Sequence, residues 1–282
     1  MTAPTPTPPC RVMGVVNVTP DSFVGEVRTP GRDEAVARCH ALIEEGANIL
    51  DVGGESTRPG ATPIPIDEEL RRVLPVIEAV MAELPAHVQM SIDTRHEAVA
   101  RAAVGAGATI INDMSASLGL VAGELGVGFV AAHMQGTPDS MQDDPTYASV
   151  VDDVLSEMVR SAEAARQAGA HPVWIDPGIG FGKTHAHNLE ILANIDRFAA
   201  TDFPVLIGVS RKGMIGHLHA ASDAGVALGD VPPTPTDDRL EASIALAVWC
   251  ALSGVEIVRV HDVAETVQAM QVAAARLDPG KM

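Results

Sequence analysis

The 282-residue sequence has few aromatic and few basic side chains. Aromatic residues make up 3% of the chain, which is too few for the stacking platforms of a protein that binds single-stranded nucleic acid. Lys and Arg total 19 against 37 Asp and Glu, and the resulting net charge of −18 argues against nucleic-acid or membrane partners. A small anionic substrate is not excluded, because it needs only a few local cations.

Cysteines and long apolar runs are also scarce. The three cysteines are Cys10, Cys39 and Cys250. Their wide spacing argues against a disulfide framework or a zinc site, and it fits a reducing cytoplasm. The longest apolar run, Ile244–Leu252, is too short to span a bilayer, which takes ~20 residues. Thr2–Pro9 lacks the basic and apolar regions of a signal peptide, so we expect a flexible tail over residues 1–10.

One pattern repeats through residues 11–282: a short apolar run, a polar or glycine-rich turn, and an amphipathic stretch. The expected strands are Arg11–Val18, Ile49–Val52, Val88–Ile92, Thr109–Ile111, Gly128–Ala132, Val173–Ile175, Val205–Val209 and Glu256–Val260. The expected helices begin near Asp33, Asp67, Arg95, Leu120, Ser149, His187, Asp238 and Val263. Eight such units predict one α/β domain, a (β/α)8 TIM barrel. The alternative, an open Rossmann-like sheet, would have a G-x-G-x-x-G motif, and none is present.

Two local expectations go with this pattern. Asp33 and Asp67 are plausible N-caps for the first two helices, because a short carboxylate accepts the free N–H groups there. His217–Asp237 contains three prolines and is expected to be a long irregular segment after the seventh strand.

Polar residues follow almost every expected strand, at the end of a barrel where active sites lie. Asp93, Asn112 and Asp176 follow three of the strands. Each alone is equally an N-cap candidate for the next helix. Together they predict a hydrogen-bonding set for an N–H-rich heterocycle, such as an aminopyrimidine edge.

Cationic residues follow the last two strands, in the loops where TIM barrels often bind phosphate. They are Arg211, Lys212, Arg259 and the adjacent His261. Unless they are only surface charges, they predict a phosphate site. Gly182-Lys183-Thr184 is similar to the end of a P-loop, but the first glycine of that motif falls at Pro177, so the motif fails.

Two histidine pairs have a spacing that suits a metal ion. They are His185 with His187 and His217 with His219. No third ligand lies nearby in the sequence, so exposed loop histidines are the simpler interpretation.

Eight segments in order resemble the bacterial dihydropteroate synthase family of folate biosynthesis. They are Met13–Phe23, Asp51–Ala61, Ser91–Thr94, Ile111–Asp113, His133–Gly136, Asp176–Thr184, Ser210–Lys212 and Arg259–His261. The resemblance implies a (β/α)8 barrel, a homodimer, and a transferase that joins 7,8-dihydropterin-6-ylmethyl diphosphate to 4-aminobenzoate. The products would be 7,8-dihydropteroate and diphosphate, and sulfonamides would act as inhibitors that mimic 4-aminobenzoate.

The resemblance also implies a role for individual residues. Pterin would be held by Asp93, Asn112, Asp176 and Lys212. Diphosphate would be held by Asn17, Thr57, Arg259 and His261, with Asn17 also a ligand of Mg2+. 4-Aminobenzoate would be held by Phe23, Arg58, Pro59 and Gly213. Asp93, Lys212, Arg259 and His261 would be catalytic. Among them Asp93 would stabilise a pterin-methyl cation, and Arg259 and His261 would serve as cations for the departing diphosphate.

The chain departs from the family pattern at two points. The first loop continues from Phe23 as Val24-Gly25-Glu26, where the family has Ser-Asp-Gly-Gly, and we expect Glu26 to replace the missing acid and pair with Arg58. Gly213 stands where serine or a bulkier residue often occurs. Two alternatives therefore stay open: a pterin- or folate-binding protein of the methyl-transfer type, and a catalytically weak paralogue.

Overall fold

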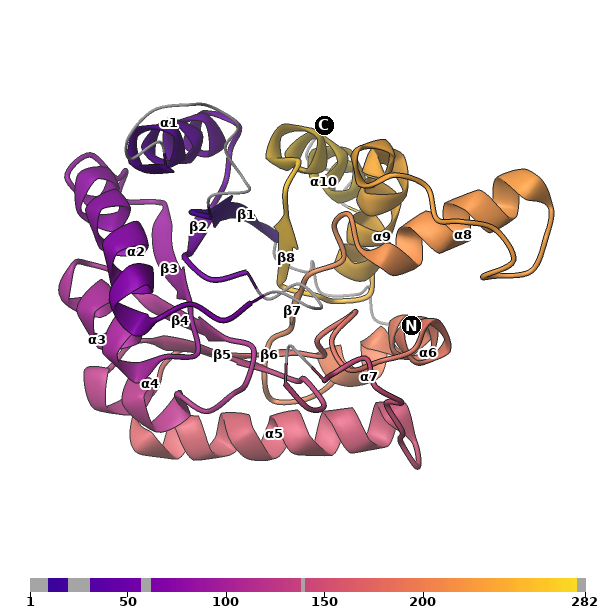
Figure 1. The fold of residues 1–282 in the computed structure, drawn as a ribbon, viewed down its shortest axis with the longest axis horizontal. Helices are drawn as coiled ribbons and strands as arrows, with labels where there is room; N and C mark the ends of the chain where they lie inside the picture. The colour runs from indigo at the N-terminus through magenta and orange to yellow at the C-terminus, as the bar shows by residue number, and fades with distance from the viewer. Residues whose placement is uncertain (1–9, 20–30, 57–61, 138–139, 278–282) are drawn as a thin grey trace.

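The computed structural model describes residues 10–19, 31–56, 62–137 and 140–277. Eight strands lie at the centre with the helices around them (Figure 1). The strands are β1 Arg11–Asn17, β2 Ile49–Gly53, β3 Gln89–Asp93, β4 Ile110–Asp113, β5 Gly128–Ala132, β6 Val173–Asp176, β7 Leu206–Ile207 and β8 Ile257–Val260. The helices are α1 Gly31–Glu44, α2 Ile66–Met81, α3 Glu97–Gly105, α4 Gly119–Leu125, α5 Val150–Ala168, α6 His185–Ala193, α7 Ile195–Ala199, α8 Gly213–Ala224, the 3-10 helix η2 Thr236–Asp238, α9 Leu240–Leu252 and α10 Val263–Leu277.

The strands form a single parallel sheet in the order β6-β5-β4-β3-β2-β1-β8-β7. The two ends of this sheet meet through a parallel bridge between Ile175 and Val205, and Ile175 N–H donates to the Pro204 carbonyl at 3.0 Å. The sheet is therefore a nearly closed (β/α)8 barrel, as the sequence predicts. The seventh strand is shorter than expected, with two residues.

An apolar layer fills the barrel interior. It consists of Met13, Ile49, Ile110, Val130, Trp174, Leu206 and Ile257, which come from seven different strands. Side chains alternate across a strand, so the residue two positions further along points to the same face. That register places Asp51, Asn112, Asp176 and Arg259 in the next layer, toward the carboxyl ends of the strands. A layer of polar residues therefore lies directly above the apolar layer of the barrel interior, at the carboxyl ends of the strands.

The expectation of an irregular segment over His217–Asp237 is wrong for its first part, which is helical. Helix α8 continues to Ala224, because Met214, Ile215 and Ala221 are buried along it, and it ends at Gly225 in a left-handed conformation, φ 65°. The prolines lie further on, between α8 and η2.

The two expected N-caps are also wrong. Helix α1 begins at Gly31 and α2 at Ile66, so Asp33 and Asp67 lie in the first helical turns. There a carboxylate interacts favourably with the positive end of the helix dipole. Among the described helices, none is both long enough and apolar enough to cross a bilayer.

Candidate active site

Asp51 lies at the centre of a hydrogen-bonded group in the barrel mouth. Its side chain is fully buried and accepts from Arg259 Nε at 2.6 Å and from Asn112 Nδ2 at 3.0 Å. Ser91 Oγ donates to the other carboxylate oxygen at 2.6 Å. Arg259 Nη2 extends this group to Asp93 Oδ2, at 2.7 Å. Strands β2, β3, β4 and β8 thus contribute to one constellation.

Asp51 was not predicted as a site residue. It lies inside an expected strand, whereas most of the predicted residues follow one. A usable signal was present: Asp51 is an acidic residue in the apolar strand Ile49–Gly53, two positions after the interior residue Ile49.

Asn112 carries a buried acceptor that is still free to bind a ligand. Its Nδ2 is used by Asp51, but its Oδ1 is buried and has no hydrogen-bond partner among the residues that the structure describes. A buried polar atom without a partner is destabilising, so it commonly marks a place where a ligand or water binds. Asn112 Oδ1 is therefore suited to accept an N–H group of a ligand.

A second group lies on the other side of the mouth. Asp176 is 5% exposed, and its Oδ1 accepts the Gly178 N–H at 2.8 Å. Lys212 Nζ lies 4.0 Å from the centre of the Phe181 ring, a cation–π contact. Phe181 was not predicted as a site residue, although it lies within the Asp176–Thr184 segment. The carboxylate comes from the last residue of β6, the ring from the loop after β6 and the ammonium from the loop after β7.

Burial shifts the pKa values of three of these groups. Removal from water raises the pKa of Asp93 to about 7; the charge of Arg259 opposes the rise, and Asp51 adds to it. Burial likewise raises the pKa of Asp176. The pKa of Lys212 is lowered to about 8 by burial, against the opposing charge of Asp176. Strongly shifted groups that share one mouth are typical of active sites.

Arg259 remains positively charged. Burial alone lowers its pKa, but Asp51 and Asp93 outweigh that effect and raise it above the ordinary value. The mouth therefore holds a permanent cation between two carboxylates.

His261 differs from the expectation that it is a cation. Burial and the charges of Arg259 and Arg211 lower its pKa to about 4, so the imidazole is neutral at pH 7. Its Nδ1 lies 3.1 Å from Ser210 Oγ. His261 can thus offer an anion an N–H group rather than a positive charge.

Arg211 also differs from its expected role. Its guanidinium forms a two-point ion pair with Asp262, with Nε–Oδ2 at 3.0 Å and a second contact from Nη2 to Oδ1. That pairing takes up the charge that was expected to serve a phosphate.

The three strand-end residues are not N-caps. Helices α3, α4 and α6 have His96, Leu118 and Thr184 as N-caps. Asp113 takes up the helix-entry role instead: its carboxylate accepts the N–H groups of Ser115, Ser117 and Leu118 at 2.7–2.9 Å. Asp93, Asn112 and Asp176 remain available for a ligand.

The P-loop-like segment has a structural role. Lys183 is 3% exposed, and its Nζ contacts His133 Nδ1 at 2.9 Å and the Phe181 carbonyl at 3.0 Å. Thr184 forms a capping box with His187 at the start of α6. Lys183 therefore connects two loops and does not bind phosphate.

The histidine pairs do not lie in loops, contrary to expectation. They belong to α6 and α8, where the rings of His185 and His217 lie 4.5 Å apart. Within the described ranges, no group of three or more His, Cys, Asp or Glu side chains is arranged to hold a metal ion.

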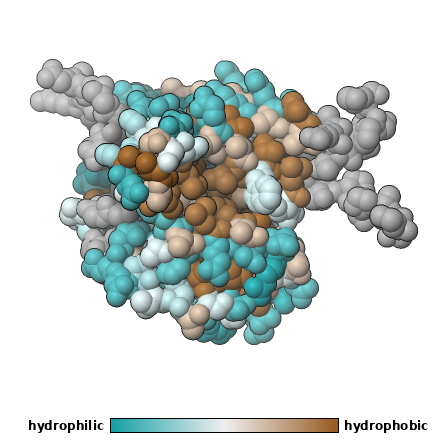
Figure 2. All heavy atoms as spheres, turned by 90° about the vertical axis from the view of Figure 1, so that its right-hand side faces the viewer, coloured by the Kyte–Doolittle hydropathy of each residue, from teal (hydrophilic) through white to brown (hydrophobic). Residues whose placement is uncertain are grey.

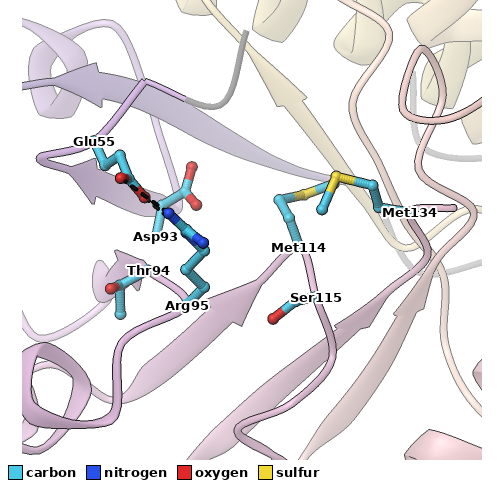
Figure 3. A pocket seen from close by; sticks show the side chains of 7 residues that line it. All are labelled: Glu55, Asp93, Thr94, Arg95, Met114, Ser115 and Met134. Carbon is cyan, nitrogen blue, oxygen red and sulfur yellow. Dashed lines mark hydrogen bonds and ion pairs between the residues drawn. The ribbon is translucent and has the colours of Figure 1, made fainter. Parts of the chain in front are cut away.

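A small cavity lies beside Asp93 (Figure 3). Its lining residues are Glu55, Asp93, Thr94, Arg95, Met114, Ser115 and Met134. Glu55 and Arg95 form an ion pair at 2.9 Å across one side, and the two methionines line the opposite side. A planar ligand here would contact both carboxylate and thioether groups.

The structure describes only some of the remaining predicted residues. Asn17 is half-buried at the carboxyl end of β1, and Gly213 is exposed as the first residue of α8. Five predicted residues lie outside the described ones: Phe23, Glu26, Thr57, Arg58 and Pro59. Their assignments stay predictions.

The fold and this constellation define a barrel protein that binds a polar heterocycle and an anion at its mouth. Residues 13–261 match the family model described as "Pterin binding enzyme". The chain belongs to that family.

Curated relatives agree with this assignment. Dihydropteroate synthase of Escherichia coli K12 is 41% identical over 95% of this chain and 92% of its own length. A probable bifunctional folylpolyglutamate synthase/dihydropteroate synthase of Haloferax volcanii is also 41% identical, but the chain spans only 31% of it.

Solved structures extend the similarity to ligand complexes. Dihydropteroate synthase of Xanthomonas albilineans with 4-aminobenzoic acid has 43% identity and a TM-score of 0.83, covering 95% of this chain and 93% of the other. Its complex with 7,8-dihydropteroate has 40% identity, a TM-score of 0.80 and the same coverage. The Yersinia pestis enzyme in a sulfonamide complex has 37% identity and a TM-score of 0.84, covering 95% and 94%.

Proposed function

We propose that this chain is a dihydropteroate synthase. It condenses 7,8-dihydropterin-6-ylmethyl diphosphate with 4-aminobenzoate and releases 7,8-dihydropteroate and diphosphate. The observation that carries this function is the hydrogen-bonded set of Asp51, Asp93, Asn112 and Arg259 in the barrel mouth. It combines acceptors for a heterocycle with a cation for an anion, and the named relatives are synthases.

The pterin is held through complementary hydrogen bonds. Its amino and ring N–H groups are donors, and the acceptors proposed for them are the carboxylates of Asp93 and Asp176 and the unpartnered Oδ1 of Asn112. Lys212 supplies the matching donor for a ring nitrogen or carbonyl. A buried donor–acceptor set of this kind rejects ligands that lack the matching groups.

The reaction begins with cleavage of the C–O bond to the diphosphate, which leaves with the electron pair. The methylene carbon becomes a cation conjugated with the pterin, and the Asp93 carboxylate stabilises that charge more than it stabilises the neutral substrate. The 4-aminobenzoate nitrogen then donates its lone pair to the methylene carbon and loses a proton. Arg259 favours the ionised form of Asp93 and, together with Asn17, Thr57 and His261, holds the diphosphate.

Magnesium is the proposed metal ion. Asn17 supplies one amide oxygen at the end of β1, and the described residues offer no cluster of anionic ligands beside it. That arrangement fits Mg2+, which keeps several waters and takes most of its other ligands from substrate phosphates. When bound there, Mg2+ would neutralise charge on the diphosphate.

4-Aminobenzoate binds at the start of α8 and the first two loops. Gly213 presents a helix N-terminus to the carboxylate, and Phe23, Arg58 and Pro59 complete the site. Sulfonamides, which mimic 4-aminobenzoate, are expected to inhibit at the same place. Related enzymes are known in complex with 4-aminobenzoic acid and with a sulfonamide, which supports the proposal that this chain binds both ligand types.

A homodimer in the cytoplasm is proposed for the assembled enzyme. Trp249 and Leu252 of α9 are 56% and 53% exposed, and apolar side chains gather on the molecular face in Figure 2. A helix that is apolar on most sides is normally covered by protein. The cytoplasmic location is proposed because the three cysteines are few and widely spaced, a usage typical of proteins in a reducing compartment. Sedimentation of Trp249→Glu against wild type tests the dimer, because a charge there should give a monomer.

Product formation tests the function. The purified protein, Mg2+, the pterin diphosphate and 4-aminobenzoate should give 7,8-dihydropteroate, detected by chromatography. A sulfonamide should inhibit competitively with 4-aminobenzoate. Pterin binding without product under these conditions would reject the synthase and favour a pterin-binding protein.

A further inference from the structure

We propose that Arg211 is a positioning residue for Lys212, held in place by Asp262, Ser243 and Arg239. This inference rests on the proposed function, because Lys212 is placed there in the pterin site. It assigns Arg211 a role in the conformation of the loop after β7 and none in binding phosphate.

The backbone of Arg211 has a conformation that residues other than glycine rarely adopt. Its φ is 58°, in the left-handed region, whereas Lys212 returns to an extended conformation with φ −61° and ψ 149°. A residue other than glycine in the left-handed region is strained and persists only where surrounding contacts hold it. This single residue therefore sets the direction in which the chain enters Lys212 and α8.

Three contacts hold Arg211 in that conformation. Its N–H donates to Ser243 Oγ at 3.0 Å, and its carbonyl accepts from Arg239 Nη1 at 3.0 Å. Its guanidinium makes the two-point ion pair with Asp262. The backbone donor, the backbone acceptor and the side chain are thus each fixed by a different residue. Such over-determination is the condition under which a strained conformation is kept.

Arg239 ties this turn to α8 and to the segment before η2. It is 8% exposed, and its Nε and Nη2 donate to the Thr234 carbonyl at 2.8 and 2.5 Å. A β-carbon added at Gly216 would lie 2.6 Å from Arg239 Nε, so the guanidinium packs directly against the α8 backbone. Its own carbonyl accepts from Ser243 Oγ at 2.5 Å. We call Asp262, Ser243 and Arg239 the clamp. It joins α8, α9 and the segment after β8 around the turn at Arg211.

The turn places Lys212 where the site requires it. Nζ lies 4.0 Å from the Phe181 ring centre, and a β-carbon added at Gly180 would lie 3.3 Å from Lys212 Cδ. The lysine chain thus runs through a tight passage beside the loop after β6. A small rotation at Arg211 would move Nζ away from the pterin, and displacements of about 1 Å in an active site can cost about 100-fold in rate.

Comparison of Arg211→Ala with Arg211→Gly tests the inference. Alanine removes the ion pair and keeps the strain, so kcat/KM for the pterin diphosphate should fall about 10- to 100-fold. Glycine adopts the left-handed conformation without strain, so Arg211→Gly should retain most of the wild-type activity.

A rescue experiment with Asp262 separates the clamp from general instability. Asp262→Asn removes the ion pair and should lower activity as Arg211→Ala does. The double variant Arg211→Gly/Asp262→Asn should recover activity, since glycine needs no clamp and no lone carboxylate is left. Thermal unfolding of each variant shows whether assays run on folded protein.

Two results would overturn the inference. If Arg211→Gly is as impaired as Arg211→Ala, the side chain itself serves the substrate; if Arg211→Ala has wild-type kinetics, the turn needs no clamp. Calorimetric titration with the pterin diphosphate supplies the same comparison without turnover. A wild-type protein that binds this ligand but forms no product would reject the proposed function, while the ranking of the variants in affinity would still decide the clamp.

Discussion

Arg259 Nη2 donates a 2.7 Å hydrogen bond to Asp93 Oδ2. Arg259, which is proposed to bind the diphosphate, thus forms an ion pair with Asp93, which is proposed to stabilise the pterin-methyl cation. Asp93 is buried, with 12% of its side chain exposed, and it would be poorly ionised without a cation beside it. Binding of a polyanion to Arg259 therefore changes the electrostatic environment of the carboxylate that faces the pterin. The leaving group and the developing cation are linked through two adjacent side chains.

Asp93→Asn should reduce kcat by about 100-fold or more while the protein stays folded. The amide keeps the shape but loses the charge that stabilises the pterin-methyl cation, and single electrostatic contributions of this kind reach about 10²–10³. Steady-state rates and circular dichroism check both parts. Arg101→Ala, which removes two exposed ion pairs, with Glu97 and with Glu124, is the control. A near-normal rate for Asp93→Asn would refute its role.

The kcat/KM for the pterin diphosphate should have a bell-shaped pH profile. Activity needs the Asp93 carboxylate, which is lost as the pH falls through about 7. It also needs the Lys212 ammonium, which is lost as the pH rises through about 8. Residual activity should lose the acid limb in Asp93→Asn and the alkaline limb in Lys212→Met. If both limbs persist in both variants, the titrating groups lie elsewhere.

Lys183 and Lys212 should respond oppositely to replacement by methionine. Lys183→Met leaves His133 Nδ1 and the Phe181 carbonyl without the donor that Lys183 supplies, whereas the Gly178 carbonyl still accepts the Phe181 N–H. It should lower the free energy of unfolding by about 1–3 kcal/mol. Lys212→Met should abolish most turnover with a smaller loss of stability. Denaturant unfolding and kcat, measured on both, distinguish the roles; equal effects on both quantities would contradict them.

Gly213→Ser should improve the KM for 4-aminobenzoate only modestly. A β-carbon at this exposed position meets no described heavy atom within 4 Å, so the hydroxyl can be added without displacement. One neutral hydrogen bond contributes about 0.5–1.5 kcal/mol, which is at most about tenfold in affinity. Gly213→Ala is the control that adds the carbon alone. An improvement of about 100-fold or more would mean that the helix N-terminus does not serve the carboxylate.

The barrel could be predicted because its determinants are local. Each strand is a short apolar run with a turn at its end, and all eight were found from that pattern. Strand β7 has two residues rather than the expected five, and Val205 pairs with Ile175 only through an isolated bridge. Helix α8 was missed over His217–Ala224, where half-buried histidines obscure the amphipathic pattern.

Asp93, Asn112 and Asp176 could be predicted because each directly follows an expected strand, and Arg259 because it is a cation near the end of one. These four residues do converge, whereas Asp51 was missed although it too lies inside an expected strand. The role of Arg211 could not be predicted, because its partner Asp262 lies 51 residues away and only the folded chain brings them together. The neutral state of His261 likewise depends on burial and neighbouring charges that no sequence pattern displays.

Diphosphate release from 7,8-dihydropterin-6-ylmethyl diphosphate, measured with and without 4-aminobenzoate, is the decisive test of the synthase activity. We expect sustained release with 4-aminobenzoate, in equal amounts with 7,8-dihydropteroate, and far slower release without it. Asp93→Asn should suppress both. Absence of release from wild type in the presence of both substrates and Mg2+ would show that the chain is not a dihydropteroate synthase.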